Sequence, residues 1–308
     1  MIVLAGDIGG THSRLALQGD SKTIQCEYRN AEFSDLYQVI EQFLDESGLG
    51  ETNIKRMVLG LPAPVGLGTV NLTNIDWQVD AEQLRQRFPV QNVLLVNDFQ
   101  AAAVGGLSGT PARQLNPDAQ ARTSGPAVVT GAGTGLGHAW VGDISSPALP
   151  WATEGGHVDF APQDDQQYQL HAWLARRLRG HVSMERLLSG PGLETIFEFL
   201  NGTRIAAADI TLRANEGDSG ATTTIDLFMR LFGSHVGNLA LLFNPVAGIH
   251  LCGGVVRHLN TWFGQQFLHA FRDKGRMQSR VEPIPLYLHD RGDIGLQGAL
   301  QIALREYQ

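Results

Sequence analysis

Cysteine is scarce in this sequence, because its 308 residues contain only Cys26 and Cys252. Two thiols are too few for a zinc site made of cysteines, or for the disulfide framework of a small secreted protein. We therefore expect two reduced thiols in a protein of the cytoplasm.

Long apolar runs are also lacking. The most hydrophobic window, residues 238–256, is interrupted by Asn244, Pro245 and His250, which suits a buried helix end and strand better than a membrane span. The first residues lack the basic segment of a secretory signal, and their apolar run stops at Asp7. These absences predict no membrane partner and a cytoplasmic location.

An excess of positive charge is missing too. Lys and Arg total 23 against 31 Asp and Glu, which gives a formal net charge of -8. Proteins that bind nucleic acid or anionic membranes need a basic surface, so we expect neither partner. With 43% apolar and 18% charged residues the composition is that of a globular protein, and the length suits about two domains.

Strand-like apolar runs alternate with helix-like periodic segments along the chain. The expected strands are residues 2–6, 13–18, 22–28, 56–61, 92–96, 126–130, 138–142, 247–251 and 284–288. The expected helices are 34–48, 80–88, 166–179, 183–189 and 223–243, with others after Phe99, after Gly254 and from about Leu296. This alternation predicts an α/β fold.

A pattern of strand, glycine-rich turn and strand occurs twice, at residues 2–18 and 126–142. Between the two copies, residues 108–125 have little apolar periodicity and are the best candidate for a linker. We expect two domains of similar topology that face each other across a cleft.

The first turn, GDIGGT at residues 6–11, combines an acid, glycines and a hydroxyl. Glycines let backbone N–H groups point into one small space, where they can bind phosphate oxygens. Asp7 would repel a phosphate unless a cation such as Mg²⁺ lay between them, so an indirect contact with magnesium is expected. The alternative is an ordinary hairpin turn with a solvated Asp7.

The second turn, GAGTGLG at residues 131–137, has four glycines in seven residues after a buried strand. It offers another phosphate-sized space beside the hydroxyl of Thr134. It is not a Walker A loop, since no Gly-Lys-Ser/Thr follows. The letters GxGxxG occur, but a strand-like run follows where a dinucleotide-binding fold would begin a helix. Two such turns favour a phosphate-binding protein.

Polar residues suited to a sugar occur in three places. Asn97 and Asp98 follow a buried strand, where side chains can point into a crevice at the sheet edge, although Asp is also a common helix cap. Glu154 and His157 in the segment EGGH, together with Glu185, add two carboxylates and an imidazole. These groups can hydrogen bond to sugar hydroxyls, but EGGH could equally be a surface loop. No third ligand lies near the Glu-x-x-His spacing, so a metal is not expected there.

Gly253 and Gly254 lie between a buried strand and a helix. Because they lack Cβ atoms, a nucleotide base or ribose could approach the backbone there. A simple strand-to-helix turn would use the same residues.

Together these motifs resemble the bacterial glucokinase family of the hexokinase and actin-type ATPase superfamily. The resemblance runs nearly end to end and rests on GDIGGTHSRLAL, LTNIDW (72–77), NDFQA (97–101), GAGTGLG, EGGHVDFAP (154–162), HVSMERLLSGPGL (181–193), GNLAL (237–241) and CGGVVRH (252–258). It implies a two-domain ribonuclease H-like, actin-like ATPase fold with an interdomain cleft. The small domain would be residues 1–108, completed by a C-terminal helix at about 298–308, and the large domain residues 109–297.

The resemblance also implies an activity, the ATP-dependent phosphorylation of D-glucose at its 6-hydroxyl, which gives glucose 6-phosphate for glycolysis. ATP would be the co-substrate with Mg²⁺, and the protein would be a homodimer. Asp98 would be the general base. The residues implied to bind glucose are Asn97, Asp98, Glu154, His157 and Glu185. Those implied to bind the nucleotide are Gly6, Asp7, Ile8, Gly9, Gly10, Thr11, Gly133, Thr134, Gly253 and Gly254.

Three other functions are open at this point. A kinase for another hexose would share these motifs. An actin-like ATPase without a sugar substrate would keep both phosphate turns but would not need Glu154, His157 and Glu185 beside Asp98. A sugar-responsive repressor would need a helix-turn-helix segment before the first strand, which this sequence does not show. The related branch of repressors and sugar kinases that binds zinc carries a cysteine-rich motif, which is also missing.

Overall fold

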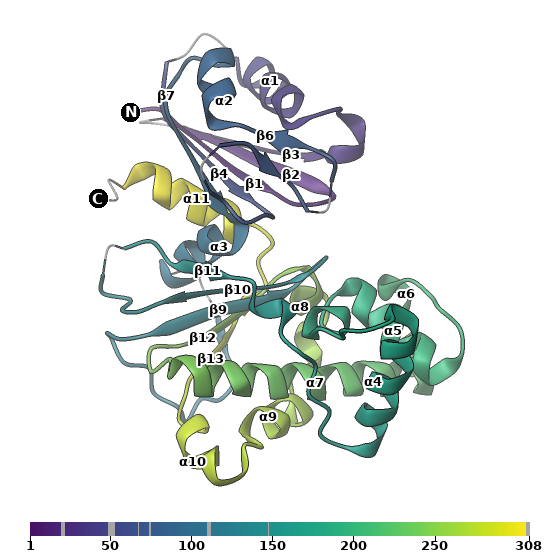
Figure 1. Ribbon diagram of the computed structural model, residues 1–308. Helices are drawn as coiled ribbons and strands as arrows, with labels where there is room; N and C mark the ends of the chain where they lie inside the picture. Colours follow the sequence, from purple (N-terminus) through teal and green to yellow (C-terminus); the bar gives the residue numbers. More distant parts are fainter. Residues whose placement is uncertain are drawn as a thin grey trace. The chain divides into compact units, whose positions relative to one another are not determined.

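The computed structural model describes residues 1–19, 22–48, 53–66, 68–73, 75–109, 112–146 and 148–305. It divides into two compact units, of which unit 1 comprises residues 1–110, 147–152 and 291–308, and unit 2 residues 111–146 and 153–290. Each unit combines a sheet with helices, which confirms the α/β prediction (Figure 1). Position 74 of the LTNIDW motif, and residues 306–308 of the expected C-terminal helix, lie outside the described residues.

The main sheet of unit 1 has five strands in the order β3-β2-β1-β4-β7. They are β1 (Val3–Ile8), β2 (His12–Gln18), β3 (Thr23–Arg29), β4 (Ile54–Leu61) and β7 (Val90–Asn97), with a separate pair β5 (Val70–Asn71) and β6 (Gln78–Val79). β1 and β2 form an antiparallel hairpin, whereas β1, β4 and β7 run parallel. The carboxyl ends of β1, β4 and β7 therefore meet at one edge of the sheet.

Helices cover both faces of this sheet. They are α1 (Leu36–Ser47), α2 (Ala81–Arg87), α3 (Asp98–Leu107) and α11 (Ile294–Leu304). Side chains alternate between the faces along β1. Leu4 and Ile8 pack in the core that contains α1 and α2, whereas Val3 and Ala5 pack in the core that contains α3 and α11.

The second sheet has six strands in the order β11-β10-β9-β12-β13-β8. They are β8 (Arg113–Gln114), β9 (Ala127–Ala132), β10 (Leu136–Val141), β11 (Trp151–Thr153), β12 (Gly248–Cys252) and β13 (Leu286–Leu288). β9 and β10 form an antiparallel hairpin, and β12 runs parallel to β9 on its other side, which repeats the arrangement of β2, β1 and β4. The repeated sequence pattern thus corresponds to one glycine-linked hairpin in each unit.

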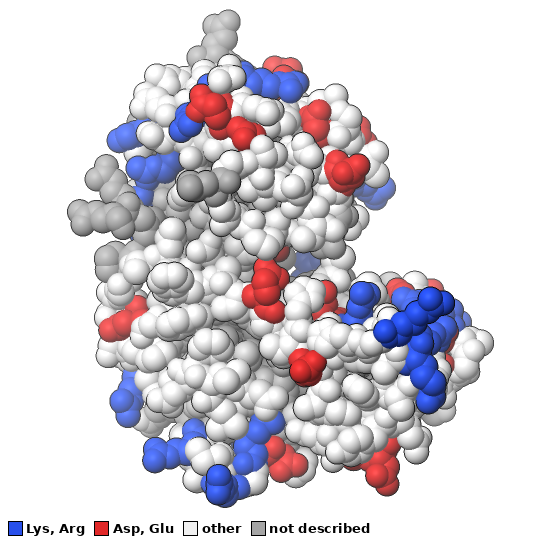
Figure 2. All heavy atoms as spheres, viewed as in Figure 1, with Lys and Arg blue, Asp and Glu red and all other residues white. Residues whose placement is uncertain are grey.

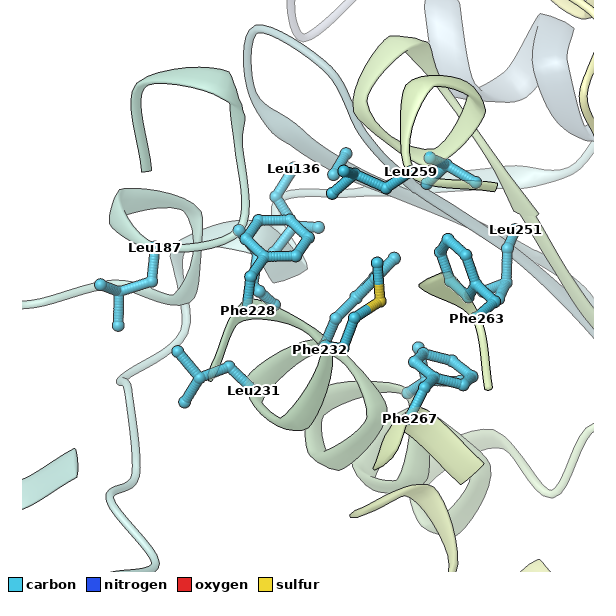
Figure 3. Packing of buried hydrophobic residues seen from close by; sticks show 14 of the residues in the cluster. Leu136, Leu187, Phe228, Leu231, Phe232, Leu251, Leu259, Phe263 and Phe267 are labelled. Carbon is cyan, nitrogen blue, oxygen red and sulfur yellow. The ribbon is translucent and has the colours of Figure 1, made fainter. Parts of the chain in front are cut away.

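The helices of unit 2 pack on this sheet and on one another. They are α4 (Asp165–Leu178), α5 (Gly190–Asn201), α6 (Ala207–Asn215), α7 (Ser219–Phe243), α8 (Gly254–His258), α9 (Gln265–Arg272) and α10 (Gln278–Val281). The longest, α7, has 25 residues. Its Phe228 and Phe232 are buried, and Phe232 packs edge-on against Phe263 and Phe267 (Figure 3). These aromatic side chains belong to the core of unit 2.

Residues 183–189, which we expected to form a helix, hold only a short 3₁₀ turn at Met184–Arg186. The helix begins later because Ser189 accepts a hydrogen bond from the Gly192 amide and caps α5. Pro191 fits the first turn of that helix, where its missing N–H costs nothing. The Ser-Gly-Pro-Gly run therefore starts a helix, although its residues are typical of turns. α6 lies where no helix was expected.

Part of the expected linker, residues 108–125, belongs to the second sheet. β8 pairs with β13 as its edge strand. The buried side chain of Asn116 accepts a hydrogen bond from the Leu286 amide and donates one to the Ile284 carbonyl, both at 2.8 Å. A buried amide with both ends bonded anchors a segment firmly. The linker prediction is therefore wrong for residues 113–116.

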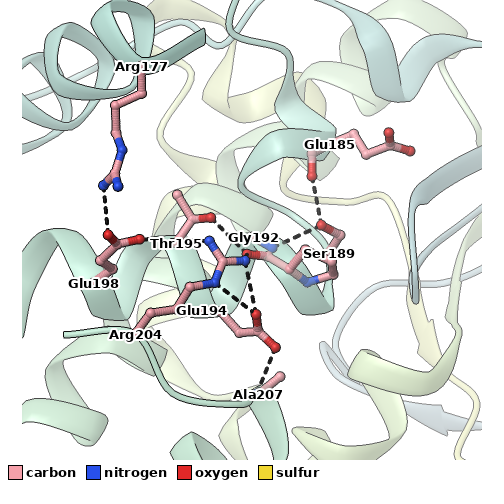
Figure 4. Close-up of polar contacts among 10 residues, drawn as sticks. Arg177, Glu185, Ser189, Gly192, Glu194, Thr195, Glu198, Arg204 and Ala207 are labelled. Carbon is pink, nitrogen blue, oxygen red and sulfur yellow. Dashed lines mark hydrogen bonds and ion pairs between the residues drawn. The ribbon is translucent and has the colours of Figure 1, made fainter.

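Acidic and basic side chains are interspersed on the face drawn in Figure 2, where one group of basic side chains lies over α4 and α5. Arginines in this region are paired. Arg177 lies 2.8 Å from Glu198, and Arg204 lies 2.9 Å from Glu194 (Figure 4). Exposed pairs of this kind contribute little to stability. They do partly neutralise the basic group.

Two buried histidine pairs lie in unit 2. Nε2 of His138 is 3.0 Å from Nε2 of His235, and Nδ1 of His250 is 2.9 Å from Nε2 of His289. Burial lowers the pKa of His138 to about 4, that of His250 to about 3 and that of His289 to about 4. These rings are therefore neutral in the folded protein near pH 7.

We predict that the folded state loses stability as the pH falls from about 6.5 towards 4. In that range the unfolded chain protonates its histidines, whose ordinary pKa is about 6.5, while the folded chain keeps them neutral. From pH 7 to pH 5, each such histidine should remove about 2 kcal/mol from the free energy of unfolding. Urea denaturation at the two pH values measures the loss. In His250→Gln the loss should shrink by about that amount, and an unchanged loss would show that His250 does not stay neutral when folded.

Candidate active site

The first glycine turn joins β1 to β2 in unit 1. The Gly9 amide donates to the His12 carbonyl at 2.9 Å, which closes the turn and leaves Gly10 and Thr11 at its tip. Gly6 and Ile8 lie in β1, and their side-chain positions face the packed core instead of the turn. A Cβ on Gly6 would lie 2.7 Å from Leu59 Cδ2, and the Ile8 side chain is fully buried in the core. Any contact that these two make with a ligand must come from their backbone.

Asp7 lies one residue before the end of β1, close to the turn, and faces Arg14 across the hairpin. Arg14 Nη1 lies 3.7 Å from Asp7 Oδ2, and Arg14 also bonds to Glu27. Burial raises the pKa of Asp7, and the nearby Arg14 opposes this rise. A Cβ on Gly295, in the first turn of α11, would lie 2.8 Å from Asp7 Oδ1. The arginine favours the charged form of this carboxylate, whereas burial and the nearby Glu27 and Asp293 oppose it.

A buried asparagine that the sequence analysis did not single out clamps this turn. The Asn30 side chain donates to the Gly9 carbonyl at 2.8 Å and accepts from the Ser13 hydroxyl at 2.8 Å. Its backbone amide donates to the Thr11 carbonyl at 3.0 Å. Asn30 is 1% exposed. Three bonds from one buried residue restrain a turn that its glycines alone would leave mobile.

Asn97 and Asp98 lie at the carboxyl edge of the unit 1 sheet, where β7 passes into α3. Asn97 caps the helix, since its Oδ1 accepts from the Phe99 amide at 2.9 Å, and its Nδ2 donates to the Ala63 carbonyl at 3.2 Å. Asp98 Oδ1 also accepts from the Phe99 amide, at 2.9 Å. A Cβ on Gly60, which pairs with Asp7 on the neighbouring strand, would lie 3.6 Å from the Asp98 Cα. Gly60 thus separates the backbone positions of the two aspartates.

The second glycine turn joins β9 to β10 in unit 2. The Gly133 amide donates to the Gly135 carbonyl at 2.8 Å, with Thr134 exposed at the tip. The Gly190 amide, at the start of α5, donates to the Gly133 carbonyl at 2.8 Å. A Cβ on Gly133 would meet nothing closer than the Gly254 amide nitrogen at 3.9 Å, and a Cβ on Gly254 would meet nothing within 4 Å. Gly133 and Gly254 therefore border open space beside their backbones.

Gly253, next to Gly254, has a packing role. Its φ is +105°, a backbone conformation that other residues rarely adopt, and a Cβ there would lie 2.5 Å from the Ala132 carbonyl oxygen. The structure thus brings Gly133, Thr134, Gly253 and Gly254 together at the ends of β9 and β12. Gly253 shapes the backbone there, whereas Gly133 and Gly254 leave space for a ligand.

The three candidate sugar residues of unit 2 form one group. His157 lies between two carboxylates, with Nε2 3.7 Å from Glu154 Oε2 and Nδ1 3.9 Å from Glu185 Oε1. The side chains of His157 and Glu154 are 57% and 63% exposed, whereas that of Glu185 is 30% exposed. Glu185 Oε2 accepts from the Leu136 amide at 2.9 Å. The group offers hydrogen-bonding atoms to solvent and is anchored at Glu185.

We predict that Asn30→Ala destabilises the protein. The substitution leaves the buried Ser13 hydroxyl and Gly9 carbonyl without their partner, at a cost of about 1–3 kcal/mol for each buried group. Urea denaturation measures the loss. Asn92→Ala, at an exposed position of the same sheet, is the control. If both variants unfolded at the same urea concentration, the hydrogen bonds of Asn30 would contribute nothing measurable to stability.

Comparison with known proteins places this geometry in a family. The glucokinase family model matches residues 4–306. A glucokinase of Tolumonas auensis is 36% identical over 310 residues, which cover 96% of this chain and 95% of that protein. The crystal structure of a glucokinase from an Antarctic psychrotroph has a TM-score of 0.82 at 28% identity and covers 98% of both chains.

A more distant structure shows the same fold. The glucokinase of Balamuthia mandrillaris, determined in complex with glucose, has a TM-score of 0.83 at 19% identity and covers 98% of this chain and 93% of its own. These matches confirm the resemblance seen in the sequence and the two-domain actin-like ATPase fold that it implies. The chain belongs to the glucokinase family of sugar kinases, which are phosphotransferases that act on an alcohol group.

Proposed function

We propose that Asp98 is the general base in the ATP-dependent phosphorylation of D-glucose at its 6-hydroxyl, the reaction of the family to which this chain belongs. The family match over residues 4–306 carries the proposal. Asp98 is the first residue of α3, at the edge where the parallel strands end. A carboxylate there can accept the hydroxyl proton as the sugar oxygen attacks phosphorus. Such a base contributes roughly 10²–10⁴ in rate.

We assign the phosphates of ATP to the two glycine turns, Gly9–Thr11 and Gly133–Thr134. Backbone N–H groups and threonine hydroxyls can donate to phosphate oxygens. The open space beside Gly133 and Gly254 supports the assignment, and it also suits the adenosine that we assign to Gly253 and Gly254. Positioning by these groups supplies much of the rate of a phosphoryl transfer, because there is little covalent chemistry for the protein to do.

Magnesium fits the site as part of the nucleotide rather than as a resident ion. Asp7 is a partly buried carboxylate beside Arg14, and the described residues contain no cluster of three or more His, Cys, Asp or Glu side chains that could hold a metal. Mg²⁺ that arrives with ATP would neutralise phosphate charge. Asp7 would hold that ion indirectly, through water, because Mg²⁺ keeps several of its waters.

We assign glucose binding to Glu154, His157 and Glu185 of unit 2 and to Asn97 and Asp98 of unit 1. Carboxylates accept hydrogen bonds from sugar hydroxyls, and a neutral imidazole can both donate and accept. The exposure of Glu154 and His157 and their positions around one imidazole support this assignment. The Asn97 side chain caps α3, so it would have to bind the sugar while it keeps its hydrogen bond to the Phe99 amide.

We propose further that the protein acts in the cytoplasm as a homodimer, binds no nucleic acid, and supplies glucose 6-phosphate to glycolysis. Among the described residues no helix is long and apolar enough to cross a membrane. The net charge of -8 disfavours a nucleic-acid partner. The homodimer follows from the resemblance to the family.

We predict that Asp98→Asn lowers kcat by roughly 10²–10⁴, because the amide cannot accept the proton. The asparagine oxygen can still accept from the Phe99 amide, so the fold should change little. Glucose 6-phosphate formation measures kcat. The matched control is Asp80→Asn, which changes the aspartate that caps α2 in the same unit and should keep the wild-type kcat. A kcat for Asp98→Asn within tenfold of wild type would rule out Asp98 as the base.

A further inference from the structure

Glu185 connects the sugar group to the second glycine turn. Its Oε2 atom accepts a hydrogen bond from the amide of Leu136, the first residue of β10, at 2.9 Å. A Cβ on Gly135 would lie 2.5 Å from the same oxygen. The carboxylate therefore occupies the place that a side chain at residue 135 would take. A bond from a charged acceptor to a backbone amide is among the stronger hydrogen bonds in proteins.

The Glu185 backbone is itself fixed. Its carbonyl accepts from the Ser189 hydroxyl at 2.8 Å, and that hydroxyl accepts from the Gly192 amide at 3.1 Å (Figure 4). The Gly190 amide then reaches the Gly133 carbonyl at 2.8 Å. The segment from Glu185 to Gly190 thus restrains the turn at both ends. The Glu185 side chain accepts from the Leu136 amide, and the Gly190 amide donates to the Gly133 carbonyl.

Leu136 is where the turn and the sugar loop, residues 154–157, meet. Its side chain is buried in the unit 2 core, which fixes its peptide groups. Its amide is taken by Glu185, and its carbonyl lies so close to Gly156 that a Cβ there would collide with it. Glu154, in contrast, has its carboxylate near His157, 3.7 Å away, and no bond from that carboxylate to the turn is found among the described residues.

We propose that Glu185 is a positioning residue for the nucleotide-binding turn in addition to its part in sugar binding. Nucleotide affinity then depends on Glu185 even when no sugar is present. The inference rests on the proposed function, which assigns the phosphates to Gly133 and Thr134 and the sugar to Glu154, His157 and Glu185. Without the carboxylate the Leu136 amide loses its partner, and the turn must be ordered when the nucleotide binds, which costs affinity.

The test is titration of the magnesium complex of a non-hydrolysable ATP analogue, by calorimetry, without sugar. Glu185→Ala should raise the Kd by about tenfold or more, the loss expected for a hydrogen bond to a charged group. Glu185→Gln should stay within about threefold of wild type, because its amide oxygen can still accept from Leu136. Glu154→Ala is the matched control, which should weaken glucose binding and leave the nucleotide Kd unchanged.

The outcomes separate this inference from the proposed function. A wild-type nucleotide Kd in Glu185→Ala, together with weakened glucose binding, would overturn the positioning role and leave the proposed function intact. Glu185→Gln binding as weakly as Glu185→Ala would overturn it as well. If wild-type protein bound the nucleotide but not glucose, the proposed function would fail first. Should Glu185→Ala not fold, Gly135→Ala replaces it, since its methyl group would displace Oε2 and should weaken nucleotide binding similarly.

Discussion

Two turns rich in glycine, one in each unit, need restraint from other residues because glycine is the residue with the least conformational preference. Each turn is therefore restrained by another part of its own unit. In unit 1 the buried Asn30 bonds to Gly9 and Thr11, and in unit 2 Glu185 and Gly190 bond to either end of the turn. The sheets and helices supply the rigid frame on which these restraints depend. Without them the glycines would leave both turns free to move.

Several proposed functional residues also have a structural role. Asn97 caps α3, Asp98 begins it, and Glu185 bonds to the backbone of a neighbouring strand. The two interpretations left open for Asn97 and Asp98, helix cap and substrate contact, are therefore compatible. Such side chains are positioned by the fold before any substrate arrives, which reduces the ordering that binding requires. Exposed Glu154 and His157 are held less tightly and lie where a sugar can reach them.

The hairpins and the glycine turns could be predicted from the sequence because their signals are local: apolar alternation, glycine and a following strand. The helix expected at 183–189 was wrong because Ser189 caps a helix that begins at Gly190, the first residue of a Gly-Pro-Gly run. The restraints could not be predicted. Asn30 lies 17 residues from Ser13, and Glu185 lies 49 residues from Leu136, so only the folded chain brings each pair together. The family motifs marked Glu185 as a sugar residue but gave no sign of its contact with the turn.

The protein transfers the γ-phosphoryl group of ATP to a hydroxyl of a sugar. The measurement that tests this activity most directly is ADP release from Mg-ATP by the purified protein, with no sugar and with each of several hexoses. The account predicts slow release alone and strong stimulation by glucose, with glucose 6-phosphate formed in equal amount. Stronger stimulation by another hexose would assign the chain a different substrate. Steady ADP release that no sugar changes would contradict the account and indicate an ATPase without a sugar substrate.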